Sequence, residues 1–146
     1  MIENKIKDIH YLIKTNNLEE ARNNIYKLLE NNPQDYDLIN LIGLVEAKKE
    51  NYKNAIDFFK QTIVINPKLI GGYINIGVAY EKLDNLTEAI KYLKKASKIN
   101  PSLEIVFSSL AKVFLKSNKY KEAILNFKKA IKINPTNSEN YFNLGN

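Results

Sequence analysis

The sequence has 146 residues, of which 45% are hydrophobic and 26% charged, a composition that favours a globular chain over a disordered one. It contains no cysteine and one histidine, His10, which excludes disulfides, thiolate chemistry and metal sites built on a histidine pair. The net charge of +6 comes from the second half, because residues 67–146 hold 13 Lys and Arg against 6 Asp and Glu, whereas residues 1–66 hold 9 against 10.

Apolar residues recur at helical spacing along the whole chain and are interrupted at short polar stretches. We expect helices at residues 2–14, 18–31, 36–49, 53–65, 70–82, 87–99, 104–116, 121–133 and from 138 onward. Paired helices are separated by Asn16-Asn17, Lys49 to Tyr52, Asp84-Asn85 and Asn118-Lys119. Asparagine tolerates the left-handed conformation that closes a helix, so these stretches are predicted turns.

The prolines divide the chain at a constant interval. Pro33, Pro67, Pro101 and Pro135 follow one another at 34 residues, and an asparagine precedes each of them. Proline disfavours the α conformation in the residue before it and cannot donate to a helical ladder. Each Asn-Pro should therefore end one helix and set up the next.

The stretch from Tyr73 to Pro101 is the most regular of the resulting units. It carries Tyr73, Ile76, Gly77, Tyr80, Ala89, Leu93, Ala96 and Pro101 at the spacing W-x2-L-G-x2-Y…A-x3-F…P. In these residues the chain resembles the tetratricopeptide repeat family. The resemblance implies an all-α fold, a right-handed superhelical solenoid of antiparallel helix pairs. It covers residues 1–146 as a single domain, with units near 2–35, 36–69, 70–103 and 104–137 and a partial unit at 138–146.

Both ends of the array depart from the regular unit. The first helix keeps an apolar stripe of Ile2, Ile6, Ile9 and Ile13 with polar residues opposite, as expected of a capping repeat. The partial unit has Tyr141, Leu144 and Gly145 in register. Without a second helix it leaves apolar surface of the preceding unit uncovered. We therefore expect that the natural chain continues or that two chains associate through their C-terminal faces.

The resemblance also implies a binding surface, because in this family the first helices of successive repeats line a concave groove. By register, the groove residues are Asn40, Leu41, Leu44, Lys48, Ile74, Asn75, Val78, Lys82, Ile105, Ser108, Ser109 and Lys112. They form an apolar floor with amide and hydroxyl groups and a lysine rim, which suits a peptide segment. Asn75 and Asn143 match asparagines that grip a ligand's main chain in some relatives, whereas Leu41 and Ser109 interrupt that series.

Two other kinds of site are not expected. The dicarboxylate clamp that holds chaperone tails needs lysine and asparagine on one first helix, asparagine on the next, and lysine and arginine on the third. The corresponding residues here are Ile6 and His10, then Leu41, then Gly71 and Asn75, which do not supply the charges. No clustered nucleophile and base, metal-ligand set or phosphate loop is present, so we expect no enzymatic activity, cofactor or metal.

The sequence thus predicts a non-enzymatic scaffold that binds a protein or peptide partner in the groove. The alternatives are self-association through the C-terminal half repeat, or anion or RNA binding through a convex lysine ridge of Lys60, Lys94, Lys95, Lys98, Lys128, Lys129 and Lys132. The assignment of the aromatics to the core disfavours nucleic acid, because no stacking platform remains. No apolar run approaches the ~20 residues that cross a bilayer, and no signal peptide is visible, so we expect no membrane insertion and a cytoplasmic location.

Overall fold

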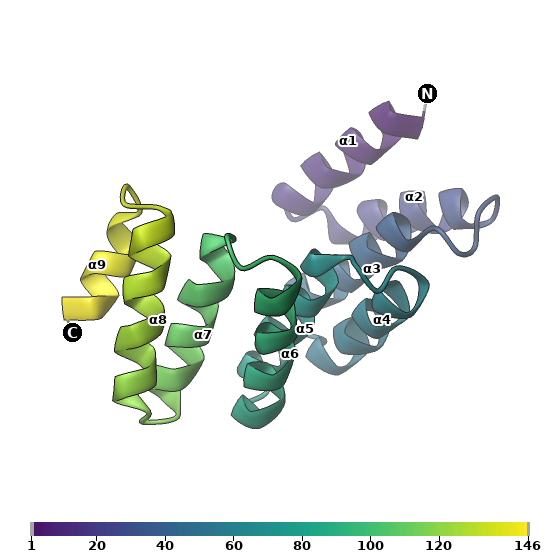
Figure 1. Cartoon of the computed structure of the whole chain (residues 1–146). Coiled ribbons are helices and arrows are strands. Elements are labelled where there is room, and N and C mark those ends of the chain that lie inside the picture. Colours follow the sequence, from purple (N-terminus) through teal and green to yellow (C-terminus); the bar gives the residue numbers. More distant parts are fainter. Residues whose placement is uncertain (1, 146) are drawn as a thin grey trace. The chain divides into compact units, whose positions relative to one another are not determined.

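The computed structural model describes residues 2–145, with only the backbone described for Ile2. Within these residues it contains nine helices and no strand, which confirms the all-α prediction (Figure 1). They are α1 (Ile2–Lys14), α2 (Leu18–Leu29), α3 (Tyr36–Lys48), α4 (Tyr52–Ile65), α5 (Ile70–Lys82), α6 (Leu86–Ile99), α7 (Glu104–Lys116), α8 (Tyr120–Ile133) and α9 (Ser138–Gly145). No described helix combines the length and the apolar character needed to cross a bilayer.

The chain divides inside α5 into two compact units, Met1–Gly72 and Tyr73–Asn146, which we call the N-terminal unit and the C-terminal unit. In the N-terminal unit, α1 packs on α2 and α3, α2 packs on α3, and α3 pairs with α4. In the C-terminal unit, α7 packs on α6 and pairs with α8, which in turn packs on α9. That residues 1–146 form a single domain stays a prediction.

The helix boundaries agree with the expected ones to within two residues. The largest difference is α2, which ends at Leu29 instead of residue 31. There the amide of Asn31 donates to the carbonyl of Leu28, three residues back, so the last turn tightens and the α-helix ends early.

The turns inside the helix pairs share one geometry. Asn16, Glu50, Asp84 and Asn118 adopt positive φ angles of 65°, 61°, 59° and 57°. The next residue's amide then reaches back five residues, for example from Asn85 to the carbonyl of Tyr80 at 2.9 Å. This is the Schellman arrangement, and it satisfies carbonyls that the helix end leaves without partners. The predicted turns are confirmed. At Glu50, however, the left-handed conformation is adopted by a glutamate, which tolerates it less well than asparagine does.

The Asn-Pro pairs work through the asparagine side chain as well as through the proline. The side-chain oxygens of Asn66, Asn100 and Asn134 accept from the amides of Lys68, Ser102 and Thr136 at 3.2, 2.9 and 3.2 Å. The same asparagines are the C-caps of α4, α6 and α8. Each asparagine thus ends one helix and folds the chain over the proline, which has no amide to donate.

The core of the N-terminal unit lies between its first three helices. Ile9 and Ile13 of α1 are buried with Ala21 and Ile25 of α2 and with Leu38, Leu41, Ile42 and Val45 of α3. Ile6 packs against the same cluster, so the stripe predicted for a capping helix faces the core; the side chain of Ile2 lies outside the described residues.

The small residues of the repeat pattern sit where helices cross closely. Ala55, Ala89 and Ala123 are fully buried, as predicted for core positions. A Cβ added to Gly77 of α5 would stand 2.6 Å from Cγ of Leu93 on α6. The two helices therefore approach to a distance that only glycine permits at this position.

Candidate functional site

The twelve residues predicted to line a groove all lie on first helices. Asn40, Leu41, Leu44 and Lys48 lie on α3 in the N-terminal unit. Ile74, Asn75, Val78 and Lys82 of α5 and Ile105, Ser108, Ser109 and Lys112 of α7 lie in the C-terminal unit. The C-terminal unit therefore holds eight of the twelve residues, on two helices, and the N-terminal unit holds the other four.

The α3 residues divide between core and surface. Leu41 is buried in the cluster with α1 and α2, because the capping helix α1 packs over this position of the repeat. Leu44 is half-buried against the same cluster, and Asn40 is half-buried as well. Lys48 is exposed at the helix end. On α3 the accessible part of the predicted surface thus consists of Asn40, Leu44 and Lys48.

The C-terminal unit offers more accessible apolar surface. Ile74, Asn75 and Val78 are half-buried on α5, and Ile105 on α7 has 47% of its surface exposed. Ser109 is half-buried, whereas Ser108 is buried and donates to the carbonyl of Ile105 at 3.1 Å. The side chain of Ser108 therefore has little surface left for a ligand.

Two lysines of α7 form ion pairs with carboxylates of neighbouring first helices. Lys112 of α7 pairs with Glu139 of α9 at 2.6 Å, and Lys116 of α7 pairs with Glu81 of α5 at 2.6 Å. The Lys112 ammonium, helped by the Asn143 amide, holds the pKa of Glu139 below its usual value. These ion pairs link neighbouring first helices and neutralise part of the predicted lysine rim, whereas Lys82 is exposed at the end of α5.

Helix α9 adds a residue that the sequence interpretation missed. Phe142 follows Ser108 by 34 residues and so occupies the same repeat position as Asn40, Ile74 and Ser108. It is 69% exposed, the largest exposed fraction of any described aromatic side chain. The signal was present in the periodicity, because extending the groove register by one more repeat reaches Phe142.

Polar side chains position α9 against α7. Oε1 of Glu104, the first residue of α7, accepts from the side-chain amides of Asn137, at 3.1 Å, and Asn140. Asn140 is buried at the position where the preceding repeat has Val106. A buried amide needs its partners, so this bond favours one placement of α9. Tyr141 and Phe142 of this half repeat are exposed. Self-association through the half repeat stays a prediction.

The sequence interpretation also missed a buried carboxylate. Glu46 of α3 is 5% exposed and occupies the repeat position that holds Tyr80 and Phe114 in the following units. The departure from an aromatic residue was visible in the sequence, but its burial depends on the helices packed around it. His10 is exposed, and the described residues contain no group of three His, Asp or Glu side chains suited to a metal ion.

Comparisons with known proteins agree with this architecture. Models of the tetratricopeptide repeat match residues 9–69 and 71–103, and a model of a TPR repeat matches residues 113–146. No curated protein sequence matches the chain.

Several solved structures share the fold. A structure from the functional characterisation of Pseudomonas aeruginosa pilF superimposes with a TM-score of 0.89 at 21% identity, covering 97% of this chain and 65% of that one. The thermophilic TPR protein TTC0263 from Thermus thermophilus gives 0.85 at 21% identity, covering 99% and 79%. A MamA crystal structure gives 0.82 at 21% identity, covering 92% and 79%. Motif spacing, helix pairing and these matches lead to one conclusion: the chain belongs to the tetratricopeptide repeat family.

Proposed function

We propose that the chain binds a peptide segment of a partner protein on the first helices of its C-terminal unit. Membership in the family supports the coarser statement that the chain is a scaffold for protein–protein interaction, a role that is generally non-enzymatic. The proposal adds where the peptide binds and which kinds of side chain contact it. Its supporting observation is apolar surface left accessible on first helices, at Ile105 of α7 and Phe142 of α9.

The neighbours of these apolar side chains can hold a main chain. Ser109 lies one turn from Ile105 on α7, and Asn143 is adjacent to Phe142 on α9. The Lys112–Glu139 ion pair joins the two helices. Apolar anchors flanked by amide and hydroxyl groups are what an extended or short helical peptide requires. On α5 of the same unit, we propose that Ile74, Asn75, Val78 and Lys82 make further contacts. In the N-terminal unit, Asn40, Leu44 and Lys48 of α3 are proposed as a separate candidate surface.

A pair of matched isoleucines tests the proposal. Ile105 on a first helix is 47% exposed and Ile99 on the second helix α6 is 41% exposed, so both truncations remove similar accessible surface. Peptides are selected on the wild-type chain from a random-peptide display library, and Kd of the tightest is measured by fluorescence anisotropy. Fully burying an exposed isoleucine contributes roughly 1.5 to 3 kcal/mol. Ile105 is already about half-buried, so Ile105→Ala should raise Kd about three- to tenfold.

The control variant Ile99→Ala should leave Kd unchanged, and Asn75→Ala should weaken binding. Equal effects of Ile99→Ala and Ile105→Ala, or a selection that yields no peptide, would contradict the proposal.

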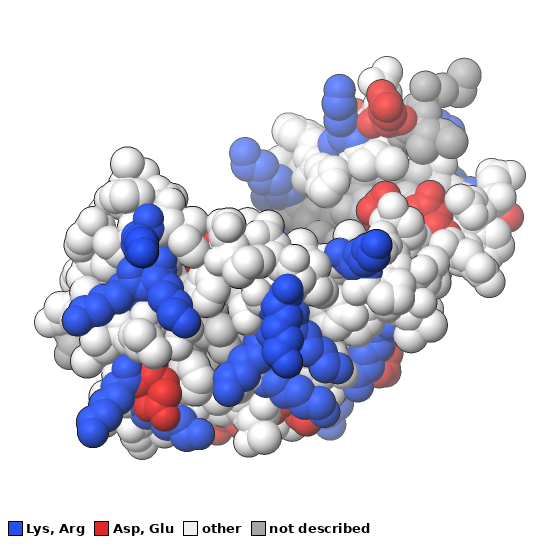
Figure 2. Space-filling model, in the orientation of Figure 1, with Lys and Arg blue, Asp and Glu red and all other residues white. Residues whose placement is uncertain are grey.

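A second candidate is anion or RNA binding by the second helices of the C-terminal unit. Helices α6 and α8 carry Lys91, Lys94, Lys95, Lys98, Lys121, Lys128, Lys129 and Lys132 against Glu88 and Glu122. Figure 2 shows these cations gathered over α6 and α8. A phosphate polymer bound there releases counterions, so its affinity should fall steeply between roughly 50 and 200 mM salt. Glutamine at Lys94, Lys98, Lys128 and Lys132 should abolish binding of a single-stranded RNA oligonucleotide, and a salt-independent affinity would exclude this candidate.

A further inference from the structure

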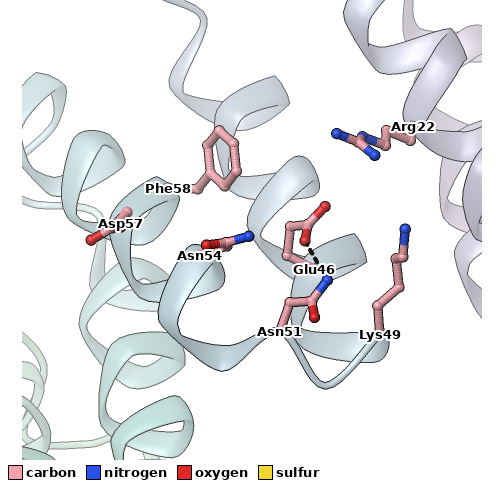
Figure 3. Close-up of a pocket in the computed structure, with 7 residues that line it drawn as sticks. All are labelled: Arg22, Glu46, Lys49, Asn51, Asn54, Asp57 and Phe58. Atoms are coloured by element: carbon pink, nitrogen blue, oxygen red, sulfur yellow. Dashed lines mark hydrogen bonds between the residues drawn. The ribbon is translucent and has the colours of Figure 1, made fainter.

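A polar hollow of about 390 Å³ opens in the N-terminal unit between α2, the end of α3 and the start of α4 (Figure 3). Its lining consists of Arg22, Glu46, Lys49, Asn51, Asn54, Asp57 and Phe58. None of these residues belongs to the proposed peptide surface. The volume corresponds to about a dozen water molecules at roughly 30 Å³ each, which is ample for a small organic ligand.

The floor of the hollow is the buried carboxylate of Glu46. Its Oε2 accepts from Nδ2 of Asn51 at 2.9 Å, and among the described residues it forms no ion pair. A carboxylate has about four acceptor positions and is costly to bury with few partners. The surface that Glu46 retains opens into the hollow, since Glu46 is part of its lining. A donor entering the hollow would therefore find an acceptor with unused capacity.

Two cations stand on the opposite side. The guanidinium of Arg22 extends from α2 and faces Glu46 across the hollow, and the ammonium of Lys49 lies on the same side as Arg22 (Figure 3). Both are held in place by neighbours outside the hollow. Arg22 lies 5.6 Å from the centre of the Tyr26 ring, and Lys49 pairs with Glu19 at 2.6 Å. The positive side is thus positioned before a ligand arrives.

The remaining residues define the edge. The Asn54 amide, the Phe58 ring and the Asp57 carboxylate lie on the α4 side of the lining (Figure 3). The lining therefore holds two carboxylates, Glu46 and Asp57, and two cations, Arg22 and Lys49, with amides and an aromatic ring beside them. A lone anion is attracted by Arg22 and Lys49 but repelled by the carboxylates, and a lone cation is attracted by the carboxylates but repelled by Arg22 and Lys49.

A ligand that carries both charges close together meets no such repulsion. We propose that the hollow binds a free α-amino acid, with its carboxylate on Arg22 and Lys49 and its ammonium on Glu46. Arginine can hold a carboxylate through two parallel hydrogen bonds, which makes Arg22 the principal contact. The side chain of the amino acid points toward Phe58 and Asn54, so apolar and amide side chains are both accommodated.

The test uses the whole chain and small probes that carry both charges of an amino acid or only one of them. Glycine and phenylalanine are titrated to about 10 mM while amide NMR signals are followed, and saturable shifts of the Asn51 and Asn54 side-chain amides are expected with Kd near 1 mM or tighter. N-acetylglycine keeps the carboxylate without the ammonium, and glycine amide keeps the ammonium without the carboxylate. Both should bind at least about tenfold more weakly than glycine, because each loses one charged contact.

Two variants locate the site. Glu46→Gln keeps the shape and the bond from Asn51 but removes the charge, and Arg22→Gln removes the opposite charge; each should raise Kd about tenfold or more. Glu50→Gln removes a carboxylate four residues away that does not line the hollow and should leave Kd unchanged. Ile105→Ala should also leave it unchanged, which separates this site from the peptide surface. Absence of saturable shifts, or equal binding of glycine and N-acetylglycine, would overturn the proposal.

Discussion

Replacing Gly77 by alanine tests the close crossing of α5 and α6. The added Cβ would stand 2.6 Å from Cγ and 3.0 Å from Cδ2 of Leu93, and 3.3 Å from the carbonyl oxygen of Ala89. Leu93 and Ala89 are fully buried, so neither has free space into which to move. The backbone oxygen of Ala89 is the less yielding of the two neighbours, because moving it means moving α6.

Gly71 in the same helix provides the matched control. A Cβ at Gly71 would meet nothing within 4 Å, so Gly71→Ala should stabilise the chain by about 0.5 to 1 kcal/mol through helix propensity alone. Gly77 lies in the interior of α5, so Gly77→Ala has at least as large a propensity gain, and it adds an overpacking cost of about 1 to 3 kcal/mol. The difference between the two variants therefore isolates the steric cost of the crossing.

Thermal unfolding followed by circular dichroism measures this difference. Gly77→Ala should melt about 3 to 10 °C below Gly71→Ala. In a Leu93→Ala background, which removes the contacts at 2.6 and 3.0 Å, Gly77→Ala should lose most of its steric cost and keep the part due to the Ala89 carbonyl oxygen at 3.3 Å. Equal melting temperatures of the two single variants would refute the reasoning, because they would mean that α5 and α6 do not approach at Gly77.

Three further predictions concern turns and charges. Glu50→Gly should stabilise the chain by about 1 kcal/mol in urea unfolding, because Glu50 has a φ of 61°, and a smaller gain is expected for Asn118→Gly; no gain at Glu50 would count against strain there. Asn100→Ala should cost about 0.5 to 1.5 kcal/mol by removing the acceptor for the Ser102 amide, whereas Asn100→Asp, which keeps an acceptor, should cost less; the reverse order would exclude the proposed turn. NMR titration of the Glu139 carboxyl should give a pKa below its usual value that rises in Lys112→Met. Since the folded pKa is lowered, the ion pair stabilises at neutral pH and this contribution is lost as the pH falls through that pKa, while an unchanged pKa in Lys112→Met would rule out the pairing in solution.

Most of the helical architecture could be predicted because its signals are local. The Asn-Pro pairs and the polar turns act through the backbone of adjacent residues, so the helix limits agree with the structure to within two residues. The early end of α2 was missed because it depends on a tightened last turn without a distinct sequence signal.

The candidate site was less predictable from register. Register placed Leu41 and Ser108 beside Asn40 and Ser109, yet the structure buries Leu41 and Ser108 and leaves Asn40 and Ser109 partly accessible. The repeat position is the same for Leu41 and Ser109, but α1 packs over the first and a different set of neighbours surrounds the second. Phe142 was missed although the repeat spacing places it at a groove position, because the sequence does not show that its side chain is exposed.

The sequence by itself determined the repeat length, the helix pairs and the residues that pack them, because periodic apolar spacing and proline geometry act over a few residues. The tertiary structure decided which side chains remain available to a ligand. Glu46 shows the difference: its identity departs visibly from Tyr80 and Phe114, but only the packing of α2 and α4 around α3 makes it a buried carboxylate facing Arg22. Burial and electrostatic environment depend on neighbours distant in sequence, and these are brought together only by the fold.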